Sequence, residues 1–137
     1  MKVTAIFDIG KTNKKFFLFD ENYQEVFKEY ICFDEIKDED SFPSYDLFVI
    51  QDWIKNIFDK VLEDERFDIS SVNFSTYGAS FVHVDENGLP VAPLYNYLKP
   101  YPENILQSFY KKYGDEMKIA LETASPSLGM LNSGLQL

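Results

Sequence analysis

The residues with the clearest potential for chemistry lie near the N-terminus, in the segment FDIGKTNKKFFLFD at positions 7–20. Asp8 stands two positions before Gly10, and Gly10 precedes a threonine, an asparagine and three lysines. Lysine side chains and backbone N–H groups bind phosphate oxygens, and carboxylates bind Mg²⁺. The segment therefore has the residue types of a phosphate site with a metal beside it.

Gly10-Lys11-Thr12 also matches the end of a P-loop, whose full pattern is Gly-x-x-x-x-Gly-Lys-[Ser/Thr] between a strand and a helix. The first glycine of that pattern would fall at position 5, where the chain has Ala5. The residues after Thr12, KKFFLF, lack the helical period and are typical of a strand. Both conditions fail, so the sequence excludes a P-loop.

A tight turn between two strands is a different phosphate-binding device, because it can direct successive backbone N–H groups into one concavity. A glycine lets the phosphate approach the backbone without a Cβ in the way. The residues that would bind the phosphates are the glycine and the donors and cations after it: Gly10, Lys11, Thr12, Asn13, Lys14 and Lys15. We predict that Asp8 holds Mg²⁺ through water, because Mg²⁺ keeps part of its hydration shell. On spacing alone, an ordinary β-turn with solvated lysines explains these residues equally well.

The elements that would position this turn follow from the apolar pattern. Strands are predicted over 3–9, 15–19 and 25–33, joined by turns at 10–14 and 20–22 as an antiparallel meander, and 34–44 as a loop. A helix is predicted over 45–63 with Ser44 as its N-cap, followed by strands over 72–76 and 80–84 and a helix over 102–113. Three meander strands, a crossover helix and another strand form the order of a ribonuclease H-like α/β fold with a mixed sheet.

Bulk composition narrows the possible partners. The 137 residues are 45% hydrophobic and 17% aromatic, which is enough for the core of one domain or part of one. A formal charge of −10 counts against nucleic acid as a partner. No apolar run approaches the roughly 20 residues that span a bilayer, so no membrane partner is expected. No signal peptide is visible, and we expect a cytoplasmic protein.

Further stretches carry a family resemblance. Residues 75–85, STYGASFVHVD, are followed by ENGLPVAPLYNY, and the chain ends in ASPSLGMLNSGLQL. Together with the segment at residues 7–20, these stretches resemble the N-terminal domain of FGGY-family sugar kinases, above all those of rhamnulokinase type. Those proteins have a Thr-aromatic-Gly-x-x-Phe run that leads into a hairpin, and a later segment that ends in Asn-x-x-x-Gln-Leu. The resemblance covers essentially all 137 residues in the same order.

The resemblance implies an actin-like ATPase fold, with two ribonuclease H-like domains around a cleft. It also implies transfer of the γ-phosphoryl group of ATP to a sugar hydroxyl with Mg²⁺. Residues 11–15 would lie where the family's first phosphate loop contacts ATP, with Asp8 assisting the metal and Lys15 matching a basic residue at the end of that loop. The implied sugar-pocket positions are Tyr77, Gly78, Ser80 and Asn96.

The chain departs from the family pattern in ways that leave the sugar open. Lys11 replaces a small residue or threonine, and Ser80 stands where rhamnulokinases carry aspartate. Tyr97 and Lys99 stand where many members have aspartate and arginine. Family members are several times longer, so we expect residues 1–137 to be the N-terminal part of the first kinase domain. The catalytic base and the adenosine site would then lie beyond residue 137, and the isolated chain should have little or no kinase activity.

Two other functions compete with this one. A metal-dependent ribonuclease H-like nuclease also begins with an aspartate on a strand near a turn, but it needs a carboxylate near the end of the fourth strand. Here that strand ends in Ser75-Thr76, which argues against a nuclease. A non-catalytic binding module that kept a degenerate kinase fold stays open, because the residues that would decide lie beyond position 137.

Overall fold

The computed structural model describes residues 1–136. Leu137, the last residue of the C-terminal stretch that resembles the kinase family, lies outside the described residues. The chain divides into two compact units, which are described one at a time. Unit 1 consists of Met1–Ile36 and Tyr45–Gly78, and unit 2 consists of Lys37–Ser44 and the residues from Ala79 onward.

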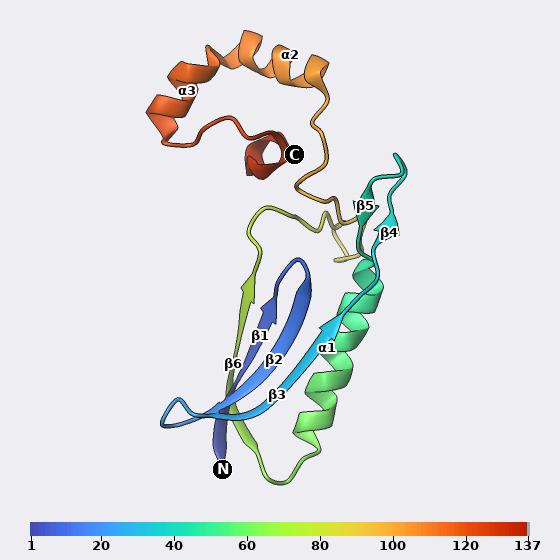
Figure 1. Ribbon diagram of the computed structural model, residues 1–137, viewed down its shortest axis with the longest axis vertical. Coiled ribbons are helices and arrows are strands. Elements are labelled where there is room, and N and C mark those ends of the chain that lie inside the picture. Colours follow the sequence, from blue (N-terminus) through green and yellow to red (C-terminus); the bar gives the residue numbers. More distant parts are fainter. Residues whose placement is uncertain (137) are drawn as a thin grey trace. The chain divides into compact units, whose positions relative to one another are not determined.

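Unit 1 is a four-stranded mixed sheet with one helix packed on it (Figure 1). The strands are β1 (Lys2–Ile9), β2 (Asn13–Asp20), β3 (Glu25–Cys32) and β6 (Asp68–Thr76), in the order β3-β2-β1-β6. β2 is antiparallel to both β1 and β3, whereas β6 pairs with β1 in parallel. The predicted meander, crossover helix and returning strand are therefore confirmed. The turn between β1 and β2 is shorter than predicted, because β2 begins at Asn13.

Alternation along the strands creates the core of unit 1. Residues of β1 and β2 are buried at every second position, so each strand presents one apolar side to helix α1 (Leu47–Leu62). The buried cluster joins both strands to the helix and consists of Val3, Ala5, Phe7, Phe16, Leu18, Trp53, Ile57 and Val61. The opposite side of β2 carries Phe17 and Phe19, whose rings lie 5.8 Å apart, and is only half-buried.

Helix α1 confirms the predicted helix, but its predicted cap is wrong. The helix begins at Leu47, and the Asp46 carboxylate accepts the Phe48 N–H at 2.9 Å. An aspartate at this position satisfies a free amide and also suits the positive end of the helix dipole. Ser44 is buried instead, and its hydroxyl donates a hydrogen bond to the Leu94 carbonyl oxygen.

Unit 2 is mostly loops and short helices. The predicted loop at 34–44, in which unit 1 ends at Ile36 and unit 2 begins at Lys37, contains a small two-stranded sheet, β4 (Ile36–Lys37) with β5 (Pro43–Ser44). The strand predicted over 80–84 is wrong, because an isolated bridge between Val84 and Pro90 stands there. Pro90 lacks the N–H that a longer ladder would need, and Asp85 accepts backbone N–H groups in a tight turn.

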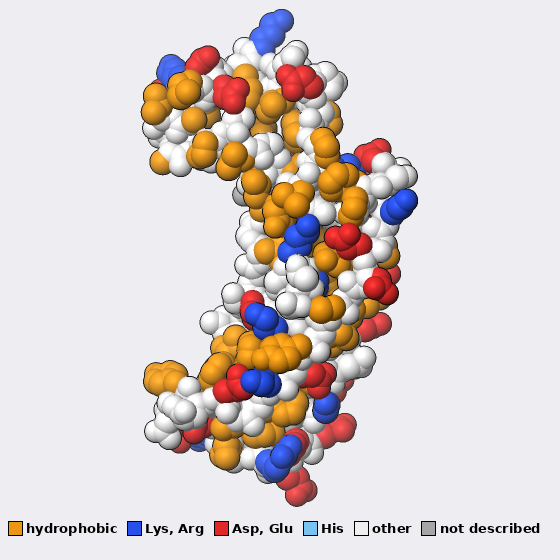
Figure 2. Space-filling model, in the orientation of Figure 1, with side chains coloured by type: hydrophobic (Ala, Val, Ile, Leu, Met, Phe, Trp, Pro, Cys, Tyr) orange, Lys and Arg blue, Asp and Glu red, His pale blue; other side chains and the backbone are white. Residues whose placement is uncertain are grey.

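The helical part of unit 2 is only partly predicted. Helix α2 (Glu103–Tyr113) confirms the helix predicted over 102–113. Helix α3 (Glu116–Thr123) was not predicted; Asp115 caps it by accepting the Lys118 N–H at 3.1 Å. Two short 3₁₀ helices follow, η1 (Gly129–Leu131) and η2 (Ser133–Leu135). Hydrophobic side chains reach the surface in both units, as the space-filling view shows (Figure 2). None of the helices in residues 1–136 is long and apolar enough to cross a bilayer.

Candidate functional site

The candidate phosphate turn closes the hairpin between β1 and β2. The last paired positions are Asp8 with Lys15 and Ile9 with Lys14, which leaves residues 10–12 as the connection. A Cβ added to Gly10 would lie 2.8 Å from the backbone carbonyl oxygen of Asn13. Because a real Cβ does not approach a backbone oxygen so closely, the turn requires glycine at this position.

We expect Gly10→Ala to destabilise unit 1 by about 1–3 kcal/mol, because the added methyl group forces the turn or the start of β2 to move. The matched control is Gly78→Ala, because nothing lies within 4 Å of a Cβ built at Gly78. We expect this variant to lose less than about 0.5 kcal/mol of unfolding free energy. Urea unfolding followed by Trp53 fluorescence measures both. Equal stabilities for the two variants would mean that the turn tolerates a side chain.

Asp8 and Lys15 are cross-strand partners that form an ion pair beside the turn. Lys15 Nζ donates to Asp8 Oδ2 at 3.0 Å, and both side chains are about one-third exposed. The pair therefore presents a carboxylate and an ammonium to solvent, next to the Gly10 turn. Within the described part of the chain, no group of three or more His, Cys, Asp and Glu residues could hold a metal ion. A single carboxylate fits the predicted contact with Mg²⁺ through water.

Lys14 lies apart from the other lysines of the motif. Its side chain is on the α1 side of the sheet with Phe16 and Leu18, whereas Lys15 is on the opposite side. The Lys14 ammonium is buried and donates to the Lys11 carbonyl oxygen at 2.8 Å. It also lies 3.8 Å from the centroid of the Tyr45 ring. Strand alternation could have revealed this difference, because positions 14, 16 and 18 share one side.

The predicted sugar-pocket residues fall in both units. In unit 1, the Tyr77 N–H donates to the Ile9 carbonyl oxygen at 3.3 Å, which places it beyond the end of β1, with Gly78 next in the chain. In unit 2, Ser80 Oγ donates to the Tyr95 carbonyl oxygen at 2.9 Å. Asn96 is buried, and its side chain donates to the Pro43 carbonyl oxygen at 3.0 Å and accepts the Leu98 N–H at 3.0 Å. In this structure Ser80 and Asn96 therefore hold the loop around residues 95–98.

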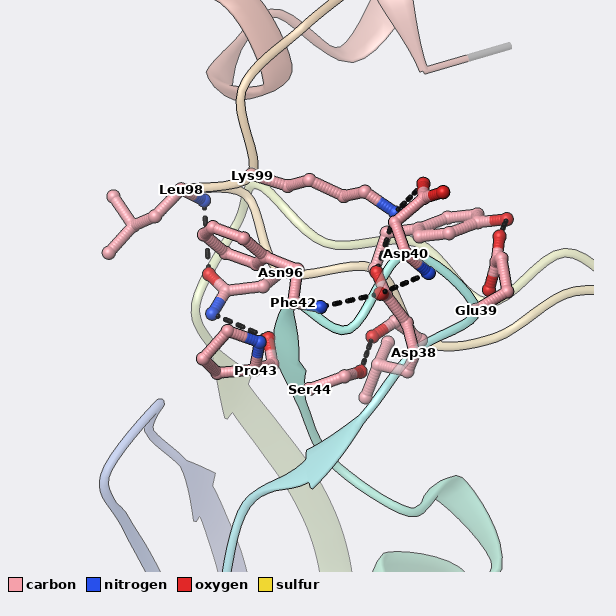
Figure 3. A network of polar contacts seen from close by, with 11 residues as sticks. Asp38, Glu39, Asp40, Phe42, Pro43, Ser44, Asn96, Leu98 and Lys99 are labelled. Carbon is pink, nitrogen blue, oxygen red and sulfur yellow. Dashed lines mark hydrogen bonds and ion pairs between the residues drawn. The ribbon is translucent and has the colours of Figure 1, made fainter.

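A polar network in unit 2 was not predicted (Figure 3). Lys99 Nζ lies 2.6 Å from Asp38 Oδ2 and 2.7 Å from Asp40 Oδ2. The Asp38 side chain is 0% exposed and also accepts the backbone N–H groups of Asp40 and Phe42. The Tyr95 hydroxyl donates to Glu39 Oε1 at 2.5 Å. These contacts join two segments some 60 residues apart in sequence, so no local pattern reveals them.

The network changes the pKa of its charged groups. Burial alone would raise the pKa of Asp38, but the Lys99 ammonium and the Phe42 and Asp40 amides outweigh it and lower the pKa. Burial alone would lower the pKa of Lys99, but the two carboxylates outweigh it and raise the pKa. Both groups are therefore held in their charged forms.

The fold matches part of the fold of solved carbohydrate kinases and is a ribonuclease H-like arrangement. A carbohydrate kinase from Novosphingobium aromaticivorans is 19% identical, with a TM-score of 0.78 over 96% of this chain and 27% of that one. A ligand-bound xylulose kinase from Lactobacillus acidophilus is 18% identical, with a TM-score of 0.67 over 88% of this chain and 24% of that one.

A glycerol kinase from Plasmodium falciparum, solved with ADP, is 19% identical, with a TM-score of 0.69 over 88% of this chain and 25% of that one. The chain thus spans about a quarter of the length of the solved structures that it matches. No protein-family model and no curated protein matches the chain by sequence. The likeness confirms the predicted fold class.

Proposed function

We propose that this chain is the N-terminal part of the first domain of an ATP-dependent sugar kinase. The observation that carries the proposal is the Asp8–Lys15 ion pair beside a turn that requires Gly10, within a fold shared with carbohydrate kinases. The glycerol kinase neighbour was solved with ADP, which supports a nucleotide as a ligand of the proposed full-length protein. A cytoplasmic location fits a reaction that consumes ATP.

In the proposed reaction, the γ-phosphoryl group moves from ATP to a sugar hydroxyl. Phosphoryl transfer depends on positioning and on neutralising charge around the phosphate oxygens, and a turn with a neighbouring ammonium can contribute both. Lys15 would contact the phosphates, and Asp8 would hold Mg²⁺ through water. The metal, when bound, would neutralise the phosphate charge. By the family resemblance, the residues that would contribute to sugar binding are Tyr77, Gly78, Ser80 and Asn96.

Several steps of this reaction need residues that we propose to lie beyond position 137. These are the base that accepts the proton of the sugar hydroxyl and the groups that bind adenosine. The chain would then bind nucleotide through the phosphates but transfer the phosphoryl group slowly or not at all. A test of the proposal must therefore measure phosphate binding and not turnover.

We expect Lys15→Met to weaken binding of Mg²⁺–ADP by the 137-residue chain at least about tenfold, because the variant loses a charge-assisted hydrogen bond worth about 1.5–3 kcal/mol. Isothermal titration calorimetry measures the change. The control is Lys118→Met, which removes the same charge from a more exposed side chain in α3. Lys118 forms only a weak 3.8 Å pair with Glu122, so the affinity should stay unchanged. Equal affinities for Lys15→Met and the unmodified chain would contradict the proposal.

A further inference from the structure

Lys14 occupies a position where its charge is costly. It is 0% exposed, on the side of β2 that packs against α1, where its neighbours along the strand are Phe16 and Leu18. Burial lowers the pKa of Lys14, while Cys32 and Glu35 act in the opposite direction. An apolar side chain of similar length would avoid the cost of removing an ammonium from water. Packing alone therefore does not explain a lysine at this position.

The contacts of the Lys14 ammonium connect the turn to the start of α1. Nζ donates to the Lys11 carbonyl oxygen at 2.8 Å, and it lies 3.8 Å from the Tyr45 ring centroid and 5.8 Å from the Phe33 ring centroid. Aromatic faces stabilise a cation, most strongly where water is excluded. One hydrogen bond and two ring faces thus hold the ammonium at a fixed place under the turn.

The carbonyl that Lys14 binds shares its peptide unit with the Thr12 N–H. A peptide unit is planar, and in the trans form its C=O and N–H point in opposite directions. The described residues contain no cis peptide bond. Because the Lys11 carbonyl oxygen points to the Lys14 ammonium, the Thr12 N–H points away from that ammonium and out of the core. An N–H with this direction suits an anion bound at the turn.

We infer that Lys14 is a positioning residue of the phosphate turn: it fixes the Lys11–Thr12 peptide so that the Thr12 N–H donates to a phosphate oxygen, and it does not itself touch the phosphate. This inference rests on the proposed function and divides the lysines of the motif between two roles. Lys15, on the exposed side, supplies charge to the ligand. Lys14, on the buried side, sets the direction of a backbone donor.

Lys14→Met tests the inference directly, because methionine keeps the length of the side chain and removes its charge. In the isotope-labelled 137-residue chain, we expect the residual dipolar coupling of the Thr12 N–H and the Lys11 carbonyl ¹³C shift to change, while the amides of β1 keep their values. These measurements need no ligand. Unchanged values at Thr12 and Lys11 would overturn the inference and leave the proposed function intact.

A titration with inorganic pyrophosphate separates the two lysines. We expect Lys14→Met to weaken binding about tenfold with the same dependence on salt as the unmodified chain, because no ligand-contacting charge is lost. Lys15→Met should weaken binding and also reduce its salt dependence, since it removes an exposed charge that salt screens. An equal fall in salt dependence in both variants would make Lys14 a direct ligand and overturn the inference. Absence of pyrophosphate binding by the unmodified chain would instead refute the proposed function.

Tyr45→Leu provides a second variant that retains Lys14. It removes the ring face nearest the ammonium, and we expect a smaller change at Thr12 in the same direction. Should Lys14→Met fail to fold, as judged by Trp53 fluorescence, this variant decides: a Thr12 coupling identical to that of the unmodified chain would overturn the inference. Lys118→Met is the control for the loss of one positive charge at an exposed site in the other unit.

Discussion

Lys99→Met is expected to destabilise the network of unit 2 by about 3–5 kcal/mol at neutral pH. The substitution leaves the Asp38 carboxylate, which is 0% exposed, without its counter-ion, and an uncompensated buried charge is costly. The amides of Asp40 and Phe42 still donate to Asp38, so the loss should fall at the lower end of this range. The structural consequence is opening of the segment 38–44.

The two pKa shifts determine the pH range in which the ion pair stabilises the fold. The folded pKa of Asp38 is lowered, so its stabilisation is complete above the unfolded pKa of about 3.9 and is lost as pH falls through the folded value. The folded pKa of Lys99 is raised, so its stabilisation is complete below about pH 10.4 and is lost as pH rises through the folded value. In Lys99→Met, Asp38 loses the pKa-lowering contact with Lys99 while burial still favours its neutral form, so acid should relieve part of the destabilisation.

Native-state hydrogen exchange at the Asp40 and Phe42 amides measures the effect locally, because both amides donate to Asp38. We expect faster exchange in Lys99→Met at pH 7 and a smaller difference from the unmodified chain near pH 4. The double variant Lys99→Met/Asp38→Asn removes both charges and should recover most of the protection. Unaltered exchange in Lys99→Met would show that the pair contributes nothing, as expected only for an exposed ion pair.

Phe7→Ala is expected to destabilise unit 1 by about 3–5 kcal/mol. Phe7 is 1% exposed and lies at the centre of the core, with ring centroids 4.8 Å from Phe16, 5.9 Å from Trp53 and 4.9 Å from Phe74. Truncation removes apolar burial and leaves a cavity between the sheet and α1. Because whole domains are stable by only about 5–15 kcal/mol, the loss brings unit 1 close to unfolding.

Thermal or urea unfolding followed by Trp53 fluorescence reports on this core directly, since Trp53 packs edge-on against Phe7. The matched control is Phe74→Ala: Phe74 is the strand partner of Phe7 on β6 and stacks on it, but it is 53% exposed. Its loss should cost no more than about 1 kcal/mol. If the two alanine variants lost equal stability, the core would not be centred on Phe7.

The elements of unit 1 were predictable because their signals are local. Alternation along β1 and β2 and the helical period of α1 repeat within a few residues, and each repeat reflects one side packed against a common core. The cap of α1 was placed two residues too early, since Ser44 and Asp46 are both good caps and only the tertiary contact of Ser44 with Leu94 decides between them.

The parts that could not be predicted depend on contacts between distant residues. The strand expected over 80–84 has apolar residues, but in the described chain it finds no partner beyond the bridge of Val84 to Pro90. The pairing of Asp38 with Lys99 spans 61 residues, and no local sequence pattern predicts it. For the candidate site, strand alternation could have shown that Lys14 and Lys15 lie on opposite sides of β2. The contacts of the Lys14 ammonium with the Lys11 carbonyl oxygen and the Tyr45 ring could not be predicted, because they depend on the turn and on residues beyond the strand.

The parallel pairing of β1 with β6 also sets an order of events during synthesis. Strands β1 to β3 can form a meander as soon as they leave the ribosome, but the other edge of β1 must wait for β6, about 67 residues later in the chain. At about 5–20 residues per second this delay lasts roughly 3–13 s. During that time the edge of the apolar strand β1 has no partner. The nascent chain is therefore most prone to self-association before residue 76 emerges.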